Sequence, residues 1–63
     1  MSDEDYWTVQ AMVTYGGNFV EALARAAQAA DDDNLRRIKA TWPEYWNRYR
    51  AMGEQLKRTR GGT

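Results

Sequence analysis

The chain has 63 residues, and its nine acidic and nine basic side chains leave no formal net charge. This length allows one small domain. The sequence contains neither cysteine nor histidine, which excludes a disulfide framework and thiol chemistry and removes the commonest general base and metal ligand. No apolar run approaches the roughly 18 residues of a membrane span, and no signal-peptide pattern is present, so we expect a soluble, cytoplasmic protein.

Charge is divided unevenly along the chain. Residues 1–33 contain seven acids and one base, whereas residues 34–63 contain eight bases and two acids. This division is typical of two oppositely charged halves that fold onto each other, with acids near helix starts where the helix dipole favours them. The alternative is a surface with an acidic end and a basic end, one of which docks a partner.

A first helix is predicted over residues 3–15. Ser2 is a suitable N-cap, and Gly16-Gly17 is expected to end the helix because glycine tolerates the left-handed conformation of a helix C-cap. Trp7 lies nearly opposite the apolar face of this helix. That face is formed, at helical spacing, by Tyr6, Val9, Met12 and Val13.

A second helix is predicted over residues 19–30, with Asn18 as its cap. The segment is rich in alanine, the best helix former. Its polar residues form one narrow stripe of Glu21, Arg25 and Gln28. We therefore expect the rest of its surface to be packed and this helix to be the central one.

Two further helices are predicted over residues 34–41 and 42–58. Asp32 or Asp33 is expected to cap the third helix. The fourth has the clearest start signal, in which a threonine caps, a proline suits the first turn and a glutamate reaches back; the segment is Thr41-Trp42-Pro43-Glu44.

The fourth helix carries apolar residues at alternating steps of four and three, which predicts a seam against another helix. We interpret Gly53 as a close contact inside a helix that reaches Arg58, in preference to a helix end. The seam consists of Trp42, Trp46, Tyr49, Gly53 and Leu56.

Together these elements predict an all-α bundle of three to four short helices in one domain over residues 1–60, with a disordered tail at 61–63. A domain this small has little interior for a substrate cavity, so we expect no enzyme activity, no cofactor and no metal site. The predicted core is Val9, Val13, Phe19, Leu23, Leu35, Ile38, Trp42, Trp46 and Tyr49.

Residues of the types that dominate binding hot spots are crowded in the fourth helix. Tyr45, Arg48 and Trp7 lie at the margin of the apolar faces or off them, so they are the better interface candidates. The predicted partner-binding residues are Trp7, Tyr15, Tyr45, Arg48, Arg50, Arg36 and Arg37.

Part of the sequence resembles a family of very short proteins encoded by bacterial phages, prophages and other mobile elements, with a recurring pattern YGGSFVxALA, then AD, then FPEYW. The match covers about residues 9–52, with Asn18 in place of serine and Trp42 in place of phenylalanine. The resemblance implies a mobile-element accessory protein and supplies no catalytic residue and no named partner. It is carried by Tyr15-Gly16-Gly17-Asn18-Phe19-Val20-Glu21-Ala22-Leu23-Ala24, by Ala30-Asp31 with Asn34, and by Trp42-Pro43-Glu44-Tyr45-Trp46 with Tyr49.

The predicted function is protein–protein interaction, in which the chain docks on a host bacterial protein and modulates or inhibits it. A defence complex such as a CRISPR effector is one concrete form of such a partner. One alternative is a nucleic-acid role, through the basic face with Arg36 and Arg37 or through imitation of phosphates by Asp31 and its neighbours, although those acids would repel DNA from the same face. Another is a structural homo-oligomer, such as a homodimer, that buries Trp7 and the aromatic residues of the fourth helix.

Overall fold

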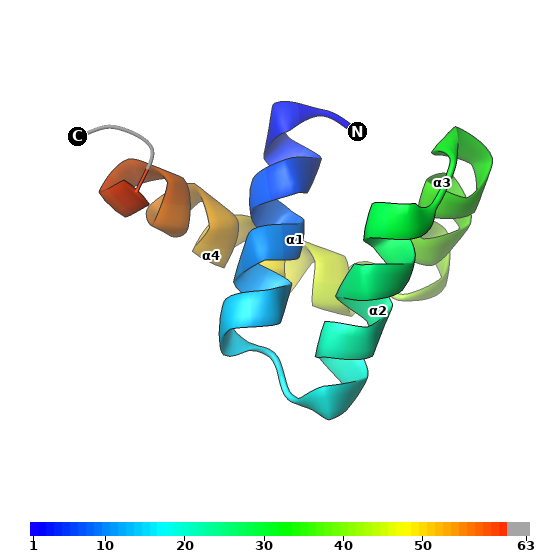
Figure 1. Cartoon of the computed structure of the whole chain (residues 1–63), viewed down its shortest axis with the longest axis horizontal. Coiled ribbons are helices and arrows are strands. Elements are labelled where there is room, and N and C mark those ends of the chain that lie inside the picture. Colours follow the sequence, from blue (N-terminus) through cyan, green and yellow to red (C-terminus); the bar gives the residue numbers. More distant parts are fainter. Residues whose placement is uncertain (61–63) are drawn as a thin grey trace.

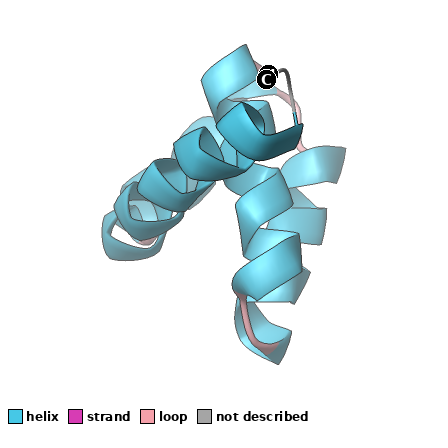
Figure 2. Ribbon diagram, turned by 90° about the vertical axis from the view of Figure 1, so that its left-hand side faces the viewer, coloured by secondary structure: helices cyan, strands magenta, loops and turns pink. Residues whose placement is uncertain are grey.

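The computed structural model describes residues 1–60, which form four helices and no strand (Figure 1, Figure 2). The predicted all-α class is confirmed, and each helix boundary lies within two residues of the predicted one. The tail predicted at 61–63 lies outside the described residues. The helices are α1 (Asp3–Tyr15), α2 (Asn18–Ala29), α3 (Asp32–Thr41) and α4 (Pro43–Arg60).

The start of α1 is capped as predicted, since the hydroxyl of Ser2 accepts the backbone N–H of Asp5 at 3.1 Å. Its end differs from the prediction. Gly16 has an extended backbone with φ of −79°, so the expected left-handed conformation is wrong. Glycine is needed here for space, because a Cβ atom would overlap the Val20 side chain and approach the carbonyl oxygen of Met12.

The caps of α2 and α3 both lie one residue or more before the predicted ones. Gly17 is the N-cap of α2, and Asn18 is already helical and caps nothing with its side chain. In α3 the carboxylate of Asp31 accepts the backbone N–H of Asn34 at 2.8 Å. The two following aspartates are therefore first-turn residues, and their prediction as caps is wrong.

The junction between α3 and α4 is made by Trp42 alone. Pro43 lies in the first turn of α4, as predicted, and is its first residue, but Thr41 is the last residue of α3 and caps nothing. Its hydroxyl donates to the carbonyl of Arg37 at 2.7 Å. Trp42 leaves the helical conformation, with φ of −127° and ψ of 61°, because a following proline disfavours that conformation.

The central helix is α1, and the prediction that the second helix holds this place is wrong. In Figure 1, α1 stands between α2 and the long α4, which crosses behind it, and α1 packs on both. α2 buries only one face, formed by Val20, Leu23, Ala24 and Ala27. Its remaining alanines are exposed, which is tolerated because a small apolar side chain places little surface in water.

The predicted seam of α4 is confirmed. Trp46, Tyr49, Gly53 and Leu56 are buried, and Trp42 at its start is half-buried. The helix continues through Gly53 to Arg60. α1 approaches the seam so closely at Gly53 that the predicted close contact is confirmed as well.

The predicted core is correct at five positions, namely Val9, Leu23, Leu35, Trp46 and Tyr49. Three more predicted positions pack half-buried at its edge, namely Val13, Ile38 and Trp42. Phe19 is the error, since it is 54% exposed. On the helical wheel it lies beside the buried face formed by Val20, Leu23, Ala24 and Ala27, about a quarter turn from the centre of that face, and so it projects past the core.

The predicted apolar face of α1 is buried at Val9 and Met12 and packs at the core edge through Val13, but the prediction is wrong at Tyr6. Tyr6 is 48% exposed, whereas Asp5 and Thr8 are buried. Each buried polar group finds a partner. The hydroxyl of Thr8 donates to the carbonyl of Glu4 at 2.8 Å, which satisfies it within the helix.

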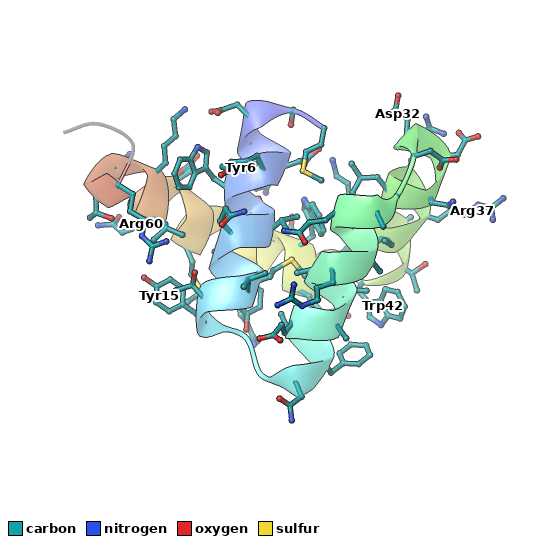
Figure 3. The ribbon with its side chains drawn as sticks, in the orientation of Figure 1. Tyr6, Tyr15, Asp32, Arg37, Trp42 and Arg60 are labelled. Carbon is teal, nitrogen blue, oxygen red and sulfur yellow. The ribbon has the colours of Figure 1, made fainter. Side chains whose placement is uncertain are left out.

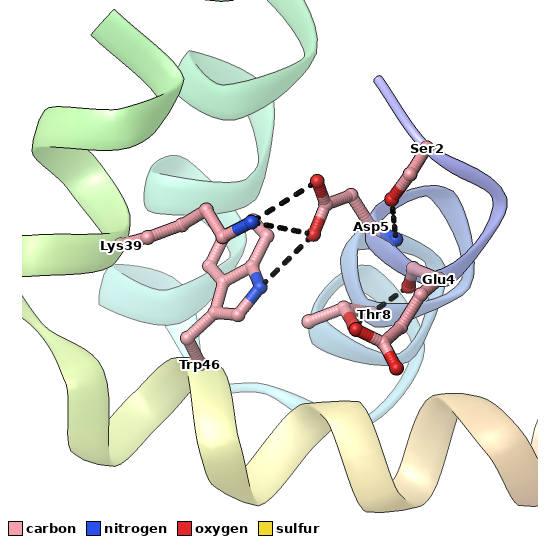
Figure 4. A network of polar contacts seen from close by, with 6 residues as sticks. All are labelled: Ser2, Glu4, Asp5, Thr8, Lys39 and Trp46. Atoms are coloured by element: carbon pink, nitrogen blue, oxygen red, sulfur yellow. Dashed lines mark hydrogen bonds and ion pairs between the residues drawn. The ribbon is translucent and has the colours of Figure 1, made fainter.

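Asp5 joins three helices in one polar network (Figure 4). It is 6% exposed and accepts two hydrogen bonds from the Lys39 ammonium of α3, at 3.0 and 3.2 Å. It also accepts the indole N–H of Trp46 of α4 at 3.3 Å. A second ion pair joins Asp3 to Lys57. The acidic first half of the chain therefore does pack against the basic second half.

Candidate functional site

Three aromatic side chains from different elements meet on the surface and form what we call the aromatic cluster, defined as Phe19, Trp42 and Tyr45. The ring of Phe19 lies 5.9 Å from the ring of Trp42 and 5.9 Å from that of Tyr45, measured between centroids. Phe19 is 54% exposed, and the other two are half-buried. Edge-on and tilted ring contacts of this kind are favourable, so the three rings stabilise one another at the surface.

Local backbone structure brings these rings together. Phe19 is the second residue of α2, and Trp42 is the single residue between α3 and α4. Tyr45 follows in the first turn of α4. Pro43 ends α3 and begins α4 with only Trp42 between them. The rings of Trp42 and Tyr45 therefore both lie next to Phe19 at the start of α2.

A groove lies beside the cluster, between α2 and α3. Its volume is about 370 Å³. The α2 wall is low because its side chains are alanines, and this is why the two helices leave a hollow between them. Trp42 belongs both to this groove and to the aromatic cluster. The lining residues are Ala26, Ala29, Ala30, Asn34, Arg37, Ile38, Thr41 and Trp42.

Arg37 is the basic group of this groove. Its side chain is exposed, and it forms no ion pair with any of residues 1–60. The neighbouring Arg36 does form one, with Asp33, at 2.7 Å. Arg37 is thus available as a hydrogen-bond donor and positive charge at the edge of an apolar hollow.

The predicted interface residue Trp7 lies elsewhere, on the side where α1 meets α4. It is half-buried and packs edge-on against Tyr6, with 5.2 Å between the ring centroids. A smaller hollow of about 160 Å³ includes Trp7 and Arg50 and is otherwise charged. Its remaining lining residues are Asp3, Glu4, Glu54 and Lys57.

The predicted partner-binding residues do not form one surface. Tyr15 is 54% exposed, but it lies far from Trp42 and Arg37 along the molecule's long axis (Figure 3). Arg48 is exposed on α4. Of the predicted set, only Tyr45 belongs to the aromatic cluster and only Arg37 to the groove.

Sequence reasoning missed Phe19 and Trp42 as surface residues by assigning both to the core. A signal for Phe19 was present. Phe19 is in register with Ala22, Ala26 and Ala29, at steps of three, four and three, and these positions are separate from the buried set that includes Leu23.

The described residues offer no metal-binding group, because no three acidic side chains within residues 1–60 converge closely enough to hold an ion. Nor does any helix in this part of the chain have the length and apolar character to cross a bilayer. No family model matches the chain, and comparisons with curated proteins and with solved structures found no match.

Proposed function

We propose that this chain is a small binding protein that docks on a host bacterial protein in the cytoplasm and modulates or inhibits it, without catalysing a reaction. The observation that carries the proposal is the aromatic cluster. It places a half-exposed phenylalanine against a tryptophan and a tyrosine on the surface of a domain that has few large side chains to spare.

The cluster has the properties of a binding hot spot. Tyrosine and tryptophan are enriched at such sites, and so is arginine, which Arg37 supplies at the adjoining groove. Exposed contiguous apolar surface also favours an interaction site. The rings already contact one another in the free protein, so little side-chain entropy would be lost on binding.

The resemblance to mobile-element proteins supports a partner from the bacterial host. Phe19, Trp42 and Tyr45 all lie in the segments that carry the resemblance. A defence complex such as a CRISPR effector is one concrete partner of this kind. Inhibition would follow from occupying a surface that the host protein needs.

The experiment is affinity capture from bacterial lysate, followed by binding measurements with the purified captured protein. We expect Tyr45→Ala to weaken this binding by about tenfold or more. Tyr6→Ala is the matched control, because it removes an exposed tyrosine from a different face. Equal binding by both variants, or equal loss in both, would contradict the proposal.

Nucleic-acid binding is the second candidate, because two adjacent arginines, Arg36 and Arg37, are exposed on α3. Several charges of this region are engaged within the chain, since Arg36 pairs with Asp33 and Asp31 caps α3. Titration with duplex DNA tests this function. Binding through these arginines requires an affinity that falls steeply between about 50 and 200 mM salt.

A further inference from the structure

The exposed face of α2 has a spacing that fits a second copy of itself. Phe19, Ala22, Ala26 and Ala29 recur at steps of three, four and three, and all four are exposed. This is the spacing of a seam between two helices. Within residues 1–60, Phe19 touches Trp42 and Tyr45 at one end of this face, and Ala26 and Ala29 border the groove toward α3, but all four side chains remain exposed.

The order of large and small residues selects an antiparallel arrangement. If two α2 helices pack about a twofold axis with Ala22 opposite Ala26 of the second copy, then Phe19 falls opposite Ala29 of that copy. The large side chain at one end of the seam thus meets the smallest at the other end. A parallel pair would instead set Phe19 against Phe19 and leave both alanine ends unfilled.

The groove supplies the space that this arrangement needs. It lies beside Ala26, Ala29 and Ala30 and has a volume of about 370 Å³, which is ample for a phenyl ring. On a helical wheel, Phe19 projects on the same side of the seam as Ala26 and Ala30. A twofold axis perpendicular to the two helices places equivalent edges of both helices on the same side of the dimer. Phe19 of one copy therefore faces the edge of the second copy that carries Ala26 and Ala30, which is the edge that borders the groove.

Charge is compatible with the same arrangement. Glu21 and Arg25 border the seam, and within one copy they pair at 3.7 Å. Antiparallel copies bring equal numbers of acids and bases to this border. Each Arg25 lies about 3 Å along the helix axis from the level of Glu21 in the second copy, as two residues of helix rise require.

We propose that the chain forms a twofold dimer in which the α2 helices pack antiparallel and Phe19 of each copy enters the groove between α2 and α3 of the other. A standard interface removes about 800 Å² from each copy, which is a large share of this chain's surface of 4198 Å². Because the proposed contact is made mainly by one face of one helix, we expect a weak dimer that dissociates on dilution. Phe19 also belongs to the aromatic cluster, so a host protein and a second copy would compete for it.

Sedimentation velocity of the purified chain tests the dimer without any host protein. Over about 1 μM to 1 mM protein, we expect a shift from monomer to dimer. Ala22→Arg should weaken the dimer by about tenfold or more, because it inserts charge at the centre of the seam. Ala51→Arg, at an exposed alanine of α4, is the matched control and should leave it unchanged. Ala22→Arg also leaves all three rings of the aromatic cluster in place, so the proposed host binding is judged separately.

Cysteine cross-linking tests the register, since the chain has no cysteine of its own. A mixture of Ala22→Cys and Ala26→Cys should cross-link on oxidation more readily than either variant alone. In this register the two Ala22 positions of a dimer are offset by about 6 Å along the helix axis, and so are the two Ala26 positions. Added to the lateral spacing of the helices, this offset makes the distance between identical positions too long for a disulfide. A chain that stays monomeric, a dimer indifferent to Ala22→Arg, or equal cross-linking by Ala51→Cys would overturn the proposal.

Discussion

Gly53 of α4 lies against the carbonyl group of Trp7 in α1, and a Cβ atom on the glycine would be 2.6 Å from that oxygen. The two longest helices therefore touch backbone to backbone at this point. The next nearest atoms are also main-chain atoms, of Trp7 and Thr8. Because main-chain atoms cannot rotate away as a side chain does, a side chain here would force the helices apart.

We expect Gly53→Ala to lower the free energy of unfolding by about 1–3 kcal/mol, as overpacking of a tight contact does. The same change at an exposed position inside a helix would raise it, because alanine is the better helix former. The measurement is urea unfolding followed by circular dichroism. Gly17→Ala is the control for steric overlap, since a Cβ atom there meets nothing within 4 Å; because Gly17 is the N-cap of α2, we expect it to lose only the smaller free energy of a poorer cap. A Gly53→Ala protein as stable as the original would contradict the backbone contact.

Asp5→Ala tests the polar network. The change leaves the Lys39 ammonium and the Trp46 indole N–H without their acceptor, and we expect a loss of about 1–3 kcal/mol in unfolding free energy. Lys39 is 40% exposed, so water satisfies part of its demand and keeps the loss in this range. The signal of the Trp46 indole proton in NMR spectra should also shift.

The control for Asp5 is Asp32→Ala, because Asp32 is an exposed acid in the first turn of α3. Its favourable effect on the helix dipole is about 0.3–1 kcal/mol. Equal losses of unfolding free energy in the two variants would show that the contacts of Asp5 with Lys39 and Trp46 do not stabilise the fold.

Asp31, the observed N-cap of α3, and Asn18, the residue predicted to cap the second helix, differ in their side-chain contacts. Asp31→Ala removes the acceptor of the Asn34 N–H and should lower stability by about 0.5–2 kcal/mol. Asn18→Ala should have little effect or be slightly stabilising, because Asn18 caps nothing and alanine is the better helix former. Thermal unfolding of the two variants at one protein concentration checks the order, and the reverse order would refute the observed cap of α3.

Phe19 and Trp46 should differ sharply as stability determinants, although the sequence assigned both to the core. Trp46 is 4% exposed and Phe19 is 54% exposed. We expect Trp46→Ala to cost about 3–5 kcal/mol, which is enough to unfold so small a domain. Phe19→Ala loses only ring contacts and should cost about 0.5–1.5 kcal/mol. Unfolding curves for both variants decide the matter, and a Phe19→Ala protein that fails to fold would place Phe19 among the core residues after all.

The helices and the seam of α4 were predictable because they depend on local rules. Ser2 and Pro43 mark helix starts through their own chemistry, and α4 repeats its apolar residues at helical spacing over four turns. Gly53 was predictable as a contact because it falls on that seam. The cap residues were less so, since Asp31 and its two neighbours are chemically alike and only the path of the backbone distinguishes them.

The candidate site was largely hidden from the sequence. Tyr45 and Arg37 were named, but the ring contacts of Phe19 with Trp42 and Tyr45 join residues more than twenty positions apart. Asp5 likewise contacts Lys39 and Trp46, which lie 34 and 41 residues further along the chain. An aspartate in the first turn of a helix is normally solvated, so nothing in its neighbourhood indicated burial.

The sequence by itself determined the all-α class, the approximate extent of each helix and the face of α4 that is buried. Only the tertiary structure decided that α1 is the central helix, that Asp5 is buried and that the outer face of α2 with Phe19 remains exposed. The physical reason is that periodicity specifies which side chains share a face of a helix, whereas burial depends on which other helix lies against that face. α2 is apolar on more than one side, so its sequence permits several packings, and the contacts of α1 and α3 select one of them.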